Sequence, residues 1–161
     1  MGFFEKIFGK TEKLLYAPMV GKSIPLSQVP DPTFAEGMLG DGIAIEPTDG
    51  KVYAPCDGVV DMLFPTNHAL TLVADFGAEI LIHVGLETVS LEGKPFTPHV
   101  GEGHRVKKGQ LLLEASLTAI RAAGLSTVTP MVICNTQSYS SFETVTGEDV
   151  TNSDVLIRLS E

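Results

Sequence analysis

The sequence predicts an all-β protein built from two related halves, and three observations carry this prediction. Sixteen glycines and ten prolines are spread along 161 residues, which suits short strands joined by tight turns and disfavours long helices. With 43% hydrophobic and 19% charged residues, the chain can fill the core of one compact domain. A short stretch also occurs twice, as YAPMVGKSIPL from Tyr16 and as YAPCDGVVDML from Tyr53. Two copies predict a pseudo-symmetric sheet that each copy enters by an equivalent strand and turn.

Composition excludes several classes of function. A formal net charge of −9 disfavours nucleic acid as a partner and favours a protein partner with a basic patch. Cys56 and Cys134 lack metal-ligand spacing, so we expect two buried, reduced thiols. No apolar run reaches the length of about 18 residues that a membrane span needs, and there is no signal peptide, so we expect a soluble, cytoplasmic protein.

The first elements in chain order are a tail, residues 1–15, and a single domain, residues 16–161. Phe3, Phe4, Ile7 and Phe8 lie at helical spacing among lysines. Residues 1–13 are therefore either an amphipathic segment that contacts a membrane surface or a flexible tail whose aromatic rings dock on the protein itself.

Further along, turn residues separate short apolar runs. Asp31-Pro32 predicts a helical turn, and residues 43–45 alternate as a strand does. Asp49-Gly50 predicts a hairpin turn. Residues 99–116 repeat glycine and branched apolar residues as β-hairpins do, and SLTAIRAAG, residues 116–124, predicts a short helix. His99 and His104 lie in polar loops and are interpreted as solvated surface residues.

The segment FPTNHALTLVADFGAEILIHVGLE, from Phe64, places histidines in two strand-like runs. A hairpin centred between Asp75 and Phe76 would join the runs. It pairs these residues across the strands: Ala74 with Gly77, Leu72 with Glu79, Leu70 with Leu81, and His68 with His83. Opposed Cβ atoms in such a pair are about 4.5 to 5.5 Å apart, so both imidazoles would share one face. A shift of one residue would separate them.

Two chemistries use paired imidazoles on a rigid surface. In phosphoryl transfer a neutral imidazole nitrogen attacks phosphorus and the second ring donates to a phosphate oxygen. In a zinc site, such as that of a zinc-dependent hydrolase, His68 and His83 would be two ligands and Glu79 or Asp41 a third. Thr66, two residues before His68, either fixes the tautomer of that ring or is an ordinary strand threonine. The residues alone leave both chemistries open.

A third interpretation concerns VGEGHRVKKGQLLLEA, residues 100–115. Its turn spacing is similar to that of a lipoyl- or biotinyl-carrier hairpin with Lys107 or Lys108 as the attachment point. The Met-Lys-Met or Asp-Lys-Ala setting of such hairpins is missing, so this interpretation is the weakest.

Three motifs in order resemble the glucose-family IIA phosphocarriers of the bacterial phosphoenolpyruvate-dependent sugar phosphotransferase system, over nearly the whole chain from about Tyr16. They are Met38-Leu39-Gly40-Asp41-Gly42-Ile43-Ala44-Ile45, Phe64-Pro65-Thr66-x-His68-Ala69, and Gly77-x-x-Ile80-Leu81-Ile82-His83-Val84-Gly85-Leu86-x-Thr88-Val89-x-Leu91. The resemblance implies an antiparallel β-sandwich or barrel with a duplicated motif and short helical turns.

The resemblance also implies roles and partners. His83 would accept a phosphoryl group from the histidine-containing phosphocarrier protein and pass it to a cysteine of a IIB domain, without a cofactor. His68 would stabilise the phosphoryl group, helped by Thr66 and by backbone amides near Gly85. When unphosphorylated, family members can also bind sugar permeases or metabolic kinases, and zinc between the two histidines is conceivable in such a regulatory complex.

The family docks its partners through a shallow apolar disc around the histidines. The matching positions here are Phe34, Met38, Leu39, Val84 and Val89. Asp31 and Glu87 match the acidic positions that meet an arginine beside the donor histidine. Two departures, Asn67 for a lysine and Glu87 for an aspartate, are expected to tune partner contacts. The cognate sugar and the IIB partner are not specified by the sequence.

Overall fold

This computed structural model describes residues 13–161, and within that range most of the regular secondary structure is antiparallel β-sheet. The strands are β1 (Lys13–Tyr16), β2 (Gly21–Pro25), β3 (Asp41–Pro47), β4 (Lys51–Tyr53), β5 (Gly58–Leu63), β6 (Ala69–Ala74), β7 (Glu79–His83), β8 (Phe96–Pro98), β9 (Arg105–Val106), β10 (Leu111–Ala115), β11 (Thr129–Ile133), β12 (Ser141–Thr144), β13 (Asp149–Val150) and β14 (Val155–Ser160). The helices are α2 (Pro32–Ala35) and α3 (Leu117–Ala122), with 3-10 turns η1 (Leu26–Gln28), η2 (Thr88–Leu91) and η3 (Thr136–Ser138).

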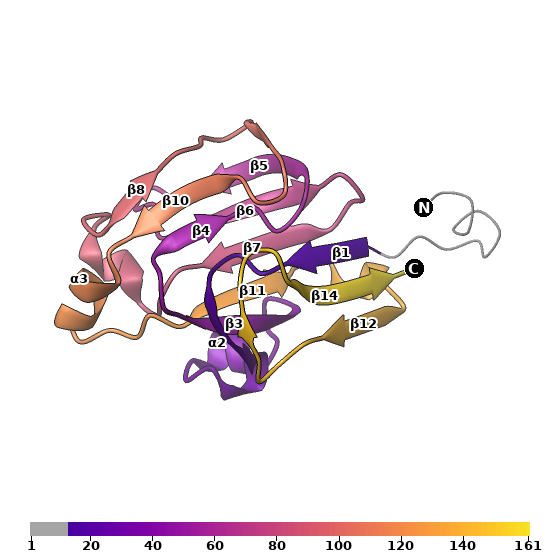
Figure 1. Ribbon diagram of the computed structural model, residues 1–161, viewed down its shortest axis with the longest axis horizontal. Coiled ribbons are helices and arrows are strands. Elements are labelled where there is room, and N and C mark those ends of the chain that lie inside the picture. Colours follow the sequence, from indigo (N-terminus) through magenta and orange to yellow (C-terminus); the bar gives the residue numbers. More distant parts are fainter. Residues whose placement is uncertain (1–12) are drawn as a thin grey trace.

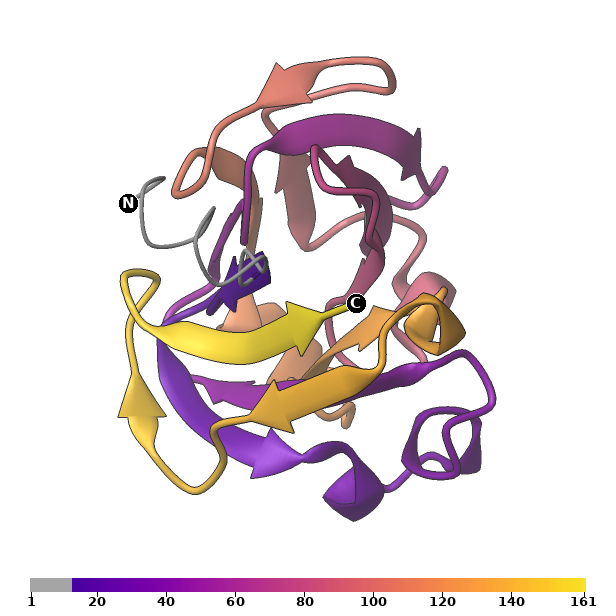
Figure 2. The ribbon, with the colours of Figure 1, turned by 90° about the vertical axis from the view of Figure 1, so that its right-hand side faces the viewer.

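An eight-stranded sheet in the order β13-β2-β3-β11-β7-β6-β5-β9 forms most of the fold. Two three-stranded sheets, β1-β14-β12 and β4-β10-β8, complete it, and the strands enclose one centre (Figures 1 and 2). The all-β, antiparallel sandwich-like fold predicted from the sequence is therefore confirmed. No helix within residues 13–161 is long and apolar enough to cross a membrane.

The duplicated stretch forms the same structure twice. Tyr16 ends β1 and Gly21 begins β2, while Tyr53 ends β4 and Gly58 begins β5. A Cβ atom at either glycine would lie only 2.1 or 2.3 Å from a carbonyl oxygen of the neighbouring strand, so only glycine fits. The predicted pair of equivalent strand-turn-strand units is confirmed.

The two copies also bond to each other. The Tyr16 N–H donates to the Pro55 carbonyl oxygen over 2.9 Å, and the Tyr53 N–H donates to the Pro18 carbonyl oxygen over 2.7 Å. Each tyrosine therefore bonds the residue two positions beyond the other tyrosine. This exchange is a local pseudo-two-fold relation at the crossing of the two halves.

The observed strands and helices decide the expectations about the domain boundary and the turns. Leu15 is fully buried and β1 pairs with β14, so the domain includes residues 13–15, which the sequence predicts as the end of the tail. Residues 1–12, and with them the amphipathic segment, lie outside the described residues. The predicted hairpin at Asp49-Gly50 is wrong, because β3 pairs with β2 and β11 whereas β4 pairs with β10. The helical turns at Asp31-Pro32 and at residues 116–124 are confirmed as α2 and α3.

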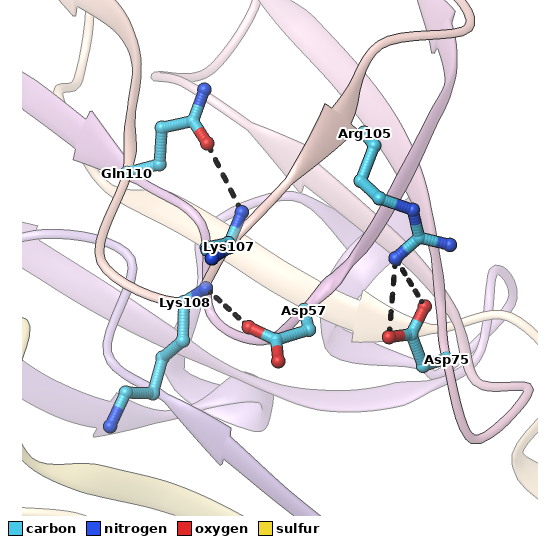
Figure 3. A network of polar contacts seen from close by, with 6 residues as sticks. All are labelled: Asp57, Asp75, Arg105, Lys107, Lys108 and Gln110. Carbon is cyan, nitrogen blue, oxygen red and sulfur yellow. Dashed lines mark hydrogen bonds and ion pairs between the residues drawn. The ribbon is translucent and has the colours of Figure 1, made fainter.

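A polar network fixes the turn between β9 and β10 (Figure 3). Arg105 donates to both carboxylate oxygens of Asp75, over 3.0 and 3.2 Å. The Lys108 backbone N–H donates to Asp57 over 2.8 Å, and its ammonium lies 4.0 Å from the centre of the Tyr16 ring. Lys108, one of the two lysines considered as an attachment point for a prosthetic group, thus contacts the surface of its own domain.

Two predictions about polar side chains need correction. His99 is not simply solvated, because its Nε2 lies 2.8 Å from a carboxylate oxygen of Glu114, which β10 brings beside the end of β8. Cys56 is buried, and burial raises the pKa of its thiol to about 12, but Cys134 is exposed. His99 directly follows β8 and Glu114 lies in β10, so spacing along the chain did not relate the two residues.

The central strands of the large sheet carry apolar side chains on both faces. Ile80 and Ile82 of β7 point into the main core, while Leu81 points to the opposite face, as strand alternation requires. On that opposite face, η1 and α2 cover a smaller group of side chains that we call the outer cluster. It comprises Leu26, Val29, Phe34, Ala44, Ala69, Leu81, Leu86, Val128 and Val132.

Candidate active site

His83 lies at the end of β7, on the face of the outer cluster. Residues two apart on a strand share a face, so the His83 imidazole lies on the same side of the sheet as Leu81, which belongs to the outer cluster. The ring packs against Phe34 of α2, with centroids 5.2 Å apart. Its Nδ1 lies 2.7 Å from the Gly85 carbonyl oxygen. A carbonyl can only accept, so Nδ1 carries the proton and Nε2 keeps a free lone pair.

The predicted hairpin register is wrong by one residue. Strand β6 pairs Ala69, not His68, with His83, and Leu70 with Ile82. The reason is the turn: the Gly77 N–H donates to the Ala74 carbonyl oxygen, so three residues, Asp75 to Gly77, form the loop. Gly77 has φ of +99°, as the last residue of a three-residue hairpin loop requires.

The two imidazoles nevertheless lie together, with ring centroids 4.9 Å apart and planes at 81°. His68 precedes β6 and is not part of the regular strand, so the alternation of faces does not apply to it. Asn67, with φ of +57°, turns the chain just before it. The Val84 N–H donates to the His68 carbonyl oxygen over 2.8 Å and fastens this bend to the end of β7.

Thr66 lies where the sequence placed it, beside the second histidine. Its hydroxyl is hydrogen-bonded to Nδ1 of His68. His68 is only 4% exposed and also packs edge-on against Phe64, with centroids 5.4 Å apart. A hydroxyl that donates to Nδ1 leaves the proton of the neutral ring on Nε2, where it can be donated.

Burial keeps both imidazoles neutral. The pKa of His68 is lowered to about 4, mainly by desolvation and further by the neighbouring His83. Desolvation also lowers the pKa of His83, and the Gly85 carbonyl and the Asp31 carboxylate oppose that shift. At neutral pH the site therefore offers one unprotonated ring nitrogen and one neutral N–H donor.

The expected docking residues divide by exposure. Met38, Leu39 and Val89 are 69%, 39% and 54% exposed, so their apolar side chains are accessible to a partner. Phe34 is 4% exposed and Val84 is fully buried. Val84 follows His83 on the chain and therefore points to the main core, which corrects the expectation that its side chain contacts partners. Phe34 packs against the His83 ring.

The two acidic candidates flank the site on different elements. Asp31 is the N-cap of α2, where its carboxylate accepts from the Thr33 N–H over 3.0 Å. It is also close enough to favour the protonated form of His83, as the direction of its effect on that pKa states. Glu87 is exposed in the loop after β7, with φ of +59°.

The zinc alternative gains no support. Across residues 13–161, no group of three or more His, Cys, Asp or Glu side chains could hold a metal ion. Glu79 begins β7 and His83 ends it, so their Cα atoms are about 13 Å apart along the strand. Neither Glu79 nor Asp41 is a third ligand.

Two features of the site were not indicated by residue patterns: the Gly85 carbonyl and the buried Thr88 side chain. The role of the Gly85 carbonyl depends on a left-handed backbone, φ of +76°, that spacing does not show. Thr88 is fully buried, and its hydroxyl donates to the Val84 carbonyl oxygen. The signal in the sequence that could have indicated a role for Thr88 is its hydroxyl, which occurs within the apolar motif around His83.

Comparison with known proteins gives one consistent result. Residues 13–139 match the family model of the phosphoenolpyruvate-dependent sugar phosphotransferase system, EIIA 1. A glucose-specific EIIA component from Bacillus anthracis is 48% identical over 152 residues, which cover 92% of this chain and 92% of that protein. A glucose permease IIA from Mycoplasma capricolum has a similar structure, with a TM-score of 0.86, 34% identity, and coverage of 92% of this chain and 96% of that chain.

A larger relative contains the same domain within a longer chain. The β-glucoside-specific EIIBCA component from Dickeya chrysanthemi is 51% identical over 134 residues, which cover 83% of this chain. The chain spans only 21% of the length of that relative. As its name states, that relative joins EIIB, EIIC and EIIA parts in one protein.

Proposed function

The chain belongs to the EIIA 1 family of the phosphoenolpyruvate-dependent sugar phosphotransferase system, and on that basis we propose that His83 carries the phosphoryl group that this chain relays. The chain is thus a phosphotransferase component in sugar uptake. The observation that carries the assignment of His83 is its hydrogen bond to the Gly85 carbonyl oxygen, which leaves Nε2 unprotonated beside a second imidazole.

In the proposed step, the Nε2 lone pair of His83 attacks the phosphorus of the donor phosphohistidine. A new N–P bond forms while the donor N–P bond breaks, and its electron pair returns to the donor imidazole. No proton has to leave Nε2, because the proton of the neutral ring is on Nδ1. In the second step, a cysteine thiolate attacks the same phosphorus and restores neutral His83.

His68 acts as the stabilising donor in this proposal. Its Nε2–H donates to a phosphoryl oxygen as charge develops, and Thr66 holds the ring in that tautomer. The pKa of about 4 keeps His68 neutral before transfer. It does not compete for the incoming phosphoryl group, because the Thr66 hydroxyl occupies its Nδ1 lone pair and its Nε2 carries the ring proton.

The partners follow from the chemistry of the two steps. The fusion of EIIA with EIIB and EIIC in a relative supports a IIB domain as the acceptor partner. The donor would be the histidine-containing phosphocarrier protein, docked on the exposed Met38, Leu39 and Val89 with Asp31 and Glu87 at the rim. A net charge of −9 favours basic surfaces on both partners. Regulated permeases or kinases would use the same surface.

The relay itself needs no metal or organic cofactor. Two imidazoles supply half of a tetrahedral zinc site, so zinc would bind here only with further ligands from a regulatory partner. The cytoplasm, where phosphoenolpyruvate-dependent donors act, is the proposed location.

Membrane contact through residues 1–13 is tested by flotation with anionic vesicles, with and without residues 1–12. Equal flotation of the two proteins would contradict membrane contact.

Labelled phosphate tests the relay. Phosphoenolpyruvate, enzyme I and the histidine-containing phosphocarrier protein are incubated with wild type, His83→Gln and His68→Gln. We expect acid-labile, base-stable label on wild type and on His68→Gln, but none on His83→Gln. On addition of a IIB domain, His68→Gln should release its label slowly. Label on His83→Gln, or none on wild type with active partners, overturns the proposal.

A further inference from the structure

We infer that Thr88 is a positioning residue, which holds the Val84–Gly85 peptide so that the Gly85 carbonyl fixes the reactive tautomer of His83. The inference rests on the proposed function for its kinetic consequence, but not for its structural one. Thr88 does not touch His83, and it acts through the two residues that follow that histidine.

The first contact is the hydroxyl of Thr88. It donates to the Val84 carbonyl oxygen over 2.5 Å, and the residue is fully buried. A buried carbonyl without a partner is costly, and a single hydrogen bond at this point removes both that cost and the freedom of the peptide to rotate. The peptide unit between Val84 and Gly85 is planar, so fixing its oxygen fixes the orientation of the Gly85 N–Cα bond as well.

The second contact is the methyl group of Thr88. A Cβ atom built on Gly85 would lie 2.5 Å from the Thr88 Cγ2 atom and 2.9 Å from the Ser126 carbonyl oxygen. The methyl group therefore occupies the space next to the Gly85 Cα atom. Gly85 has φ of +76°, a region in which glycine is otherwise free to move. Hydroxyl and methyl together restrict the one residue whose backbone could turn away from His83.

The loop is anchored on its far side too. The Leu86 N–H donates to the Ser126 carbonyl oxygen over 3.1 Å. With Val84 held by Thr88 and Leu86 held by Ser126, the Gly85 carbonyl lies between two fixed points. Its oxygen is 2.7 Å from Nδ1 of His83, so its position decides which ring nitrogen carries the proton. If this carbonyl turned away, the proton could move to Nε2 and block the nucleophilic lone pair.

Three variants separate the hydroxyl, the methyl and general stability. Thr88→Val keeps the shape but not the donor, Thr88→Ser keeps the donor but not the methyl, and Thr129→Val is the matched control. Thr129 is also fully buried, and its hydroxyl donates to a backbone carbonyl, that of Thr127, over 3.0 Å. Losing that bond should destabilise the fold without affecting His83.

The first readout is the tautomer of His83, measured by ¹⁵N chemical shifts of the imidazole without any phosphoryl donor. We expect wild type, Thr88→Ser and Thr129→Val to hold the proton on Nδ1, and Thr88→Val to populate the Nε2–H form. The second readout is the rate of phosphoryl acceptance per folded molecule. It should fall roughly tenfold or more in Thr88→Val and stay within about threefold of wild type in Thr88→Ser.

The outcomes are distinct. Folded Thr88→Val with the wild-type tautomer and rate overturns the inference, as does an equal change in Thr129→Val. If Thr88→Val does not fold, Thr88→Cys replaces it, because a thiol is a weak donor, and a cysteine variant that matches Thr88→Ser in both readouts overturns the inference. If wild type accepts no phosphoryl group, the proposed function fails, while the tautomer measurement still tests the positioning role.

Discussion

The imidazole planes of His68 and His83 meet at 81° with centroids 4.9 Å apart, so the edge of one ring faces the other. Two neutral rings favour this geometry, whereas two charged rings at this distance would repel each other. The contact therefore suits the unphosphorylated state at neutral pH. A phosphoryl group on one ring changes the electrostatics of the other.

Phosphorylation should raise the pKa of His68. The pKa of about 4 reflects desolvation and the proximity of His83, and a negative phosphoryl group beside the ring favours the protonated form. We expect an increase of about one unit or more in the phosphorylated protein. NMR titration of the His68 ring in both states measures it. An unchanged pKa would mean that the phosphoryl group lies away from His68.

His68 should make stability depend on pH. The unfolded ring binds a proton near pH 6.5 and the folded ring only near pH 4, so between these values the unfolded state holds more protons. Acidification from pH 6.5 to 4 therefore destabilises the fold, by at most about 3 kcal/mol from this group because solvent screening reduces the effect, and this group causes no further change below that range. Urea unfolding of wild type and His68→Gln across this range tests it: the loss should be smaller in the variant. Parallel curves would contradict it.

Gly85→Ala should cost far more than an alanine at another left-handed glycine. The new Cβ would lie 2.5 Å from Thr88 and 2.9 Å from a carbonyl oxygen, in addition to the strain at φ of +76°. We expect a loss of about 3 kcal/mol or more in the free energy of unfolding. Gly103→Ala is the control, because φ is +85° there but no atom lies within 4 Å, and about 1 kcal/mol is expected. Equal losses would argue against close packing at Gly85.

Val89→Ser should weaken docking without weakening the fold. The side chain is 54% exposed in η2, so stability should change by less than about 0.5 kcal/mol. The KM for the phosphorylated donor protein should rise several-fold while kcat stays near wild type. Val145→Ser, at 40% exposure near the end of β12, is the control and should leave KM unchanged. If KM rose for Val145→Ser but not for Val89→Ser, the docking surface would include Val145 and not Val89.

The fold and the histidine pair were predictable from different kinds of signal. Glycine and proline spacing, with the echo at Tyr16 and Tyr53, indicated an antiparallel fold with two equivalent entries. The pairing of His68 with His83 was predicted from a register that is one residue off. The contact exists because His68 lies in a bend before β6, outside the alternation used to predict it.

The rest depended on backbone conformation, which residue types describe poorly. A three-residue loop ending at Gly77 sets the register, but the amino-acid sequence was equally compatible with a two-residue loop. The side-chain direction of Val84 follows from strand alternation, yet a family motif alone suggested a surface role. The part played by Thr88 depends on the position of a carbonyl oxygen, and no sequence pattern encodes that.

The exchange of amide bonds between the two tyrosine segments has a consequence for synthesis. Tyr16 needs the carbonyl of Pro55, and Tyr53 needs that of Pro18, so neither segment completes its bonding alone. On the ribosome, the first segment has no partner until the second has emerged from the exit tunnel. Strand β1 must then wait longer, because its neighbour β14 follows all the other strands of the domain in the sequence. The nascent domain therefore completes its fold only after β14 has emerged, as one cooperative unit rather than half by half.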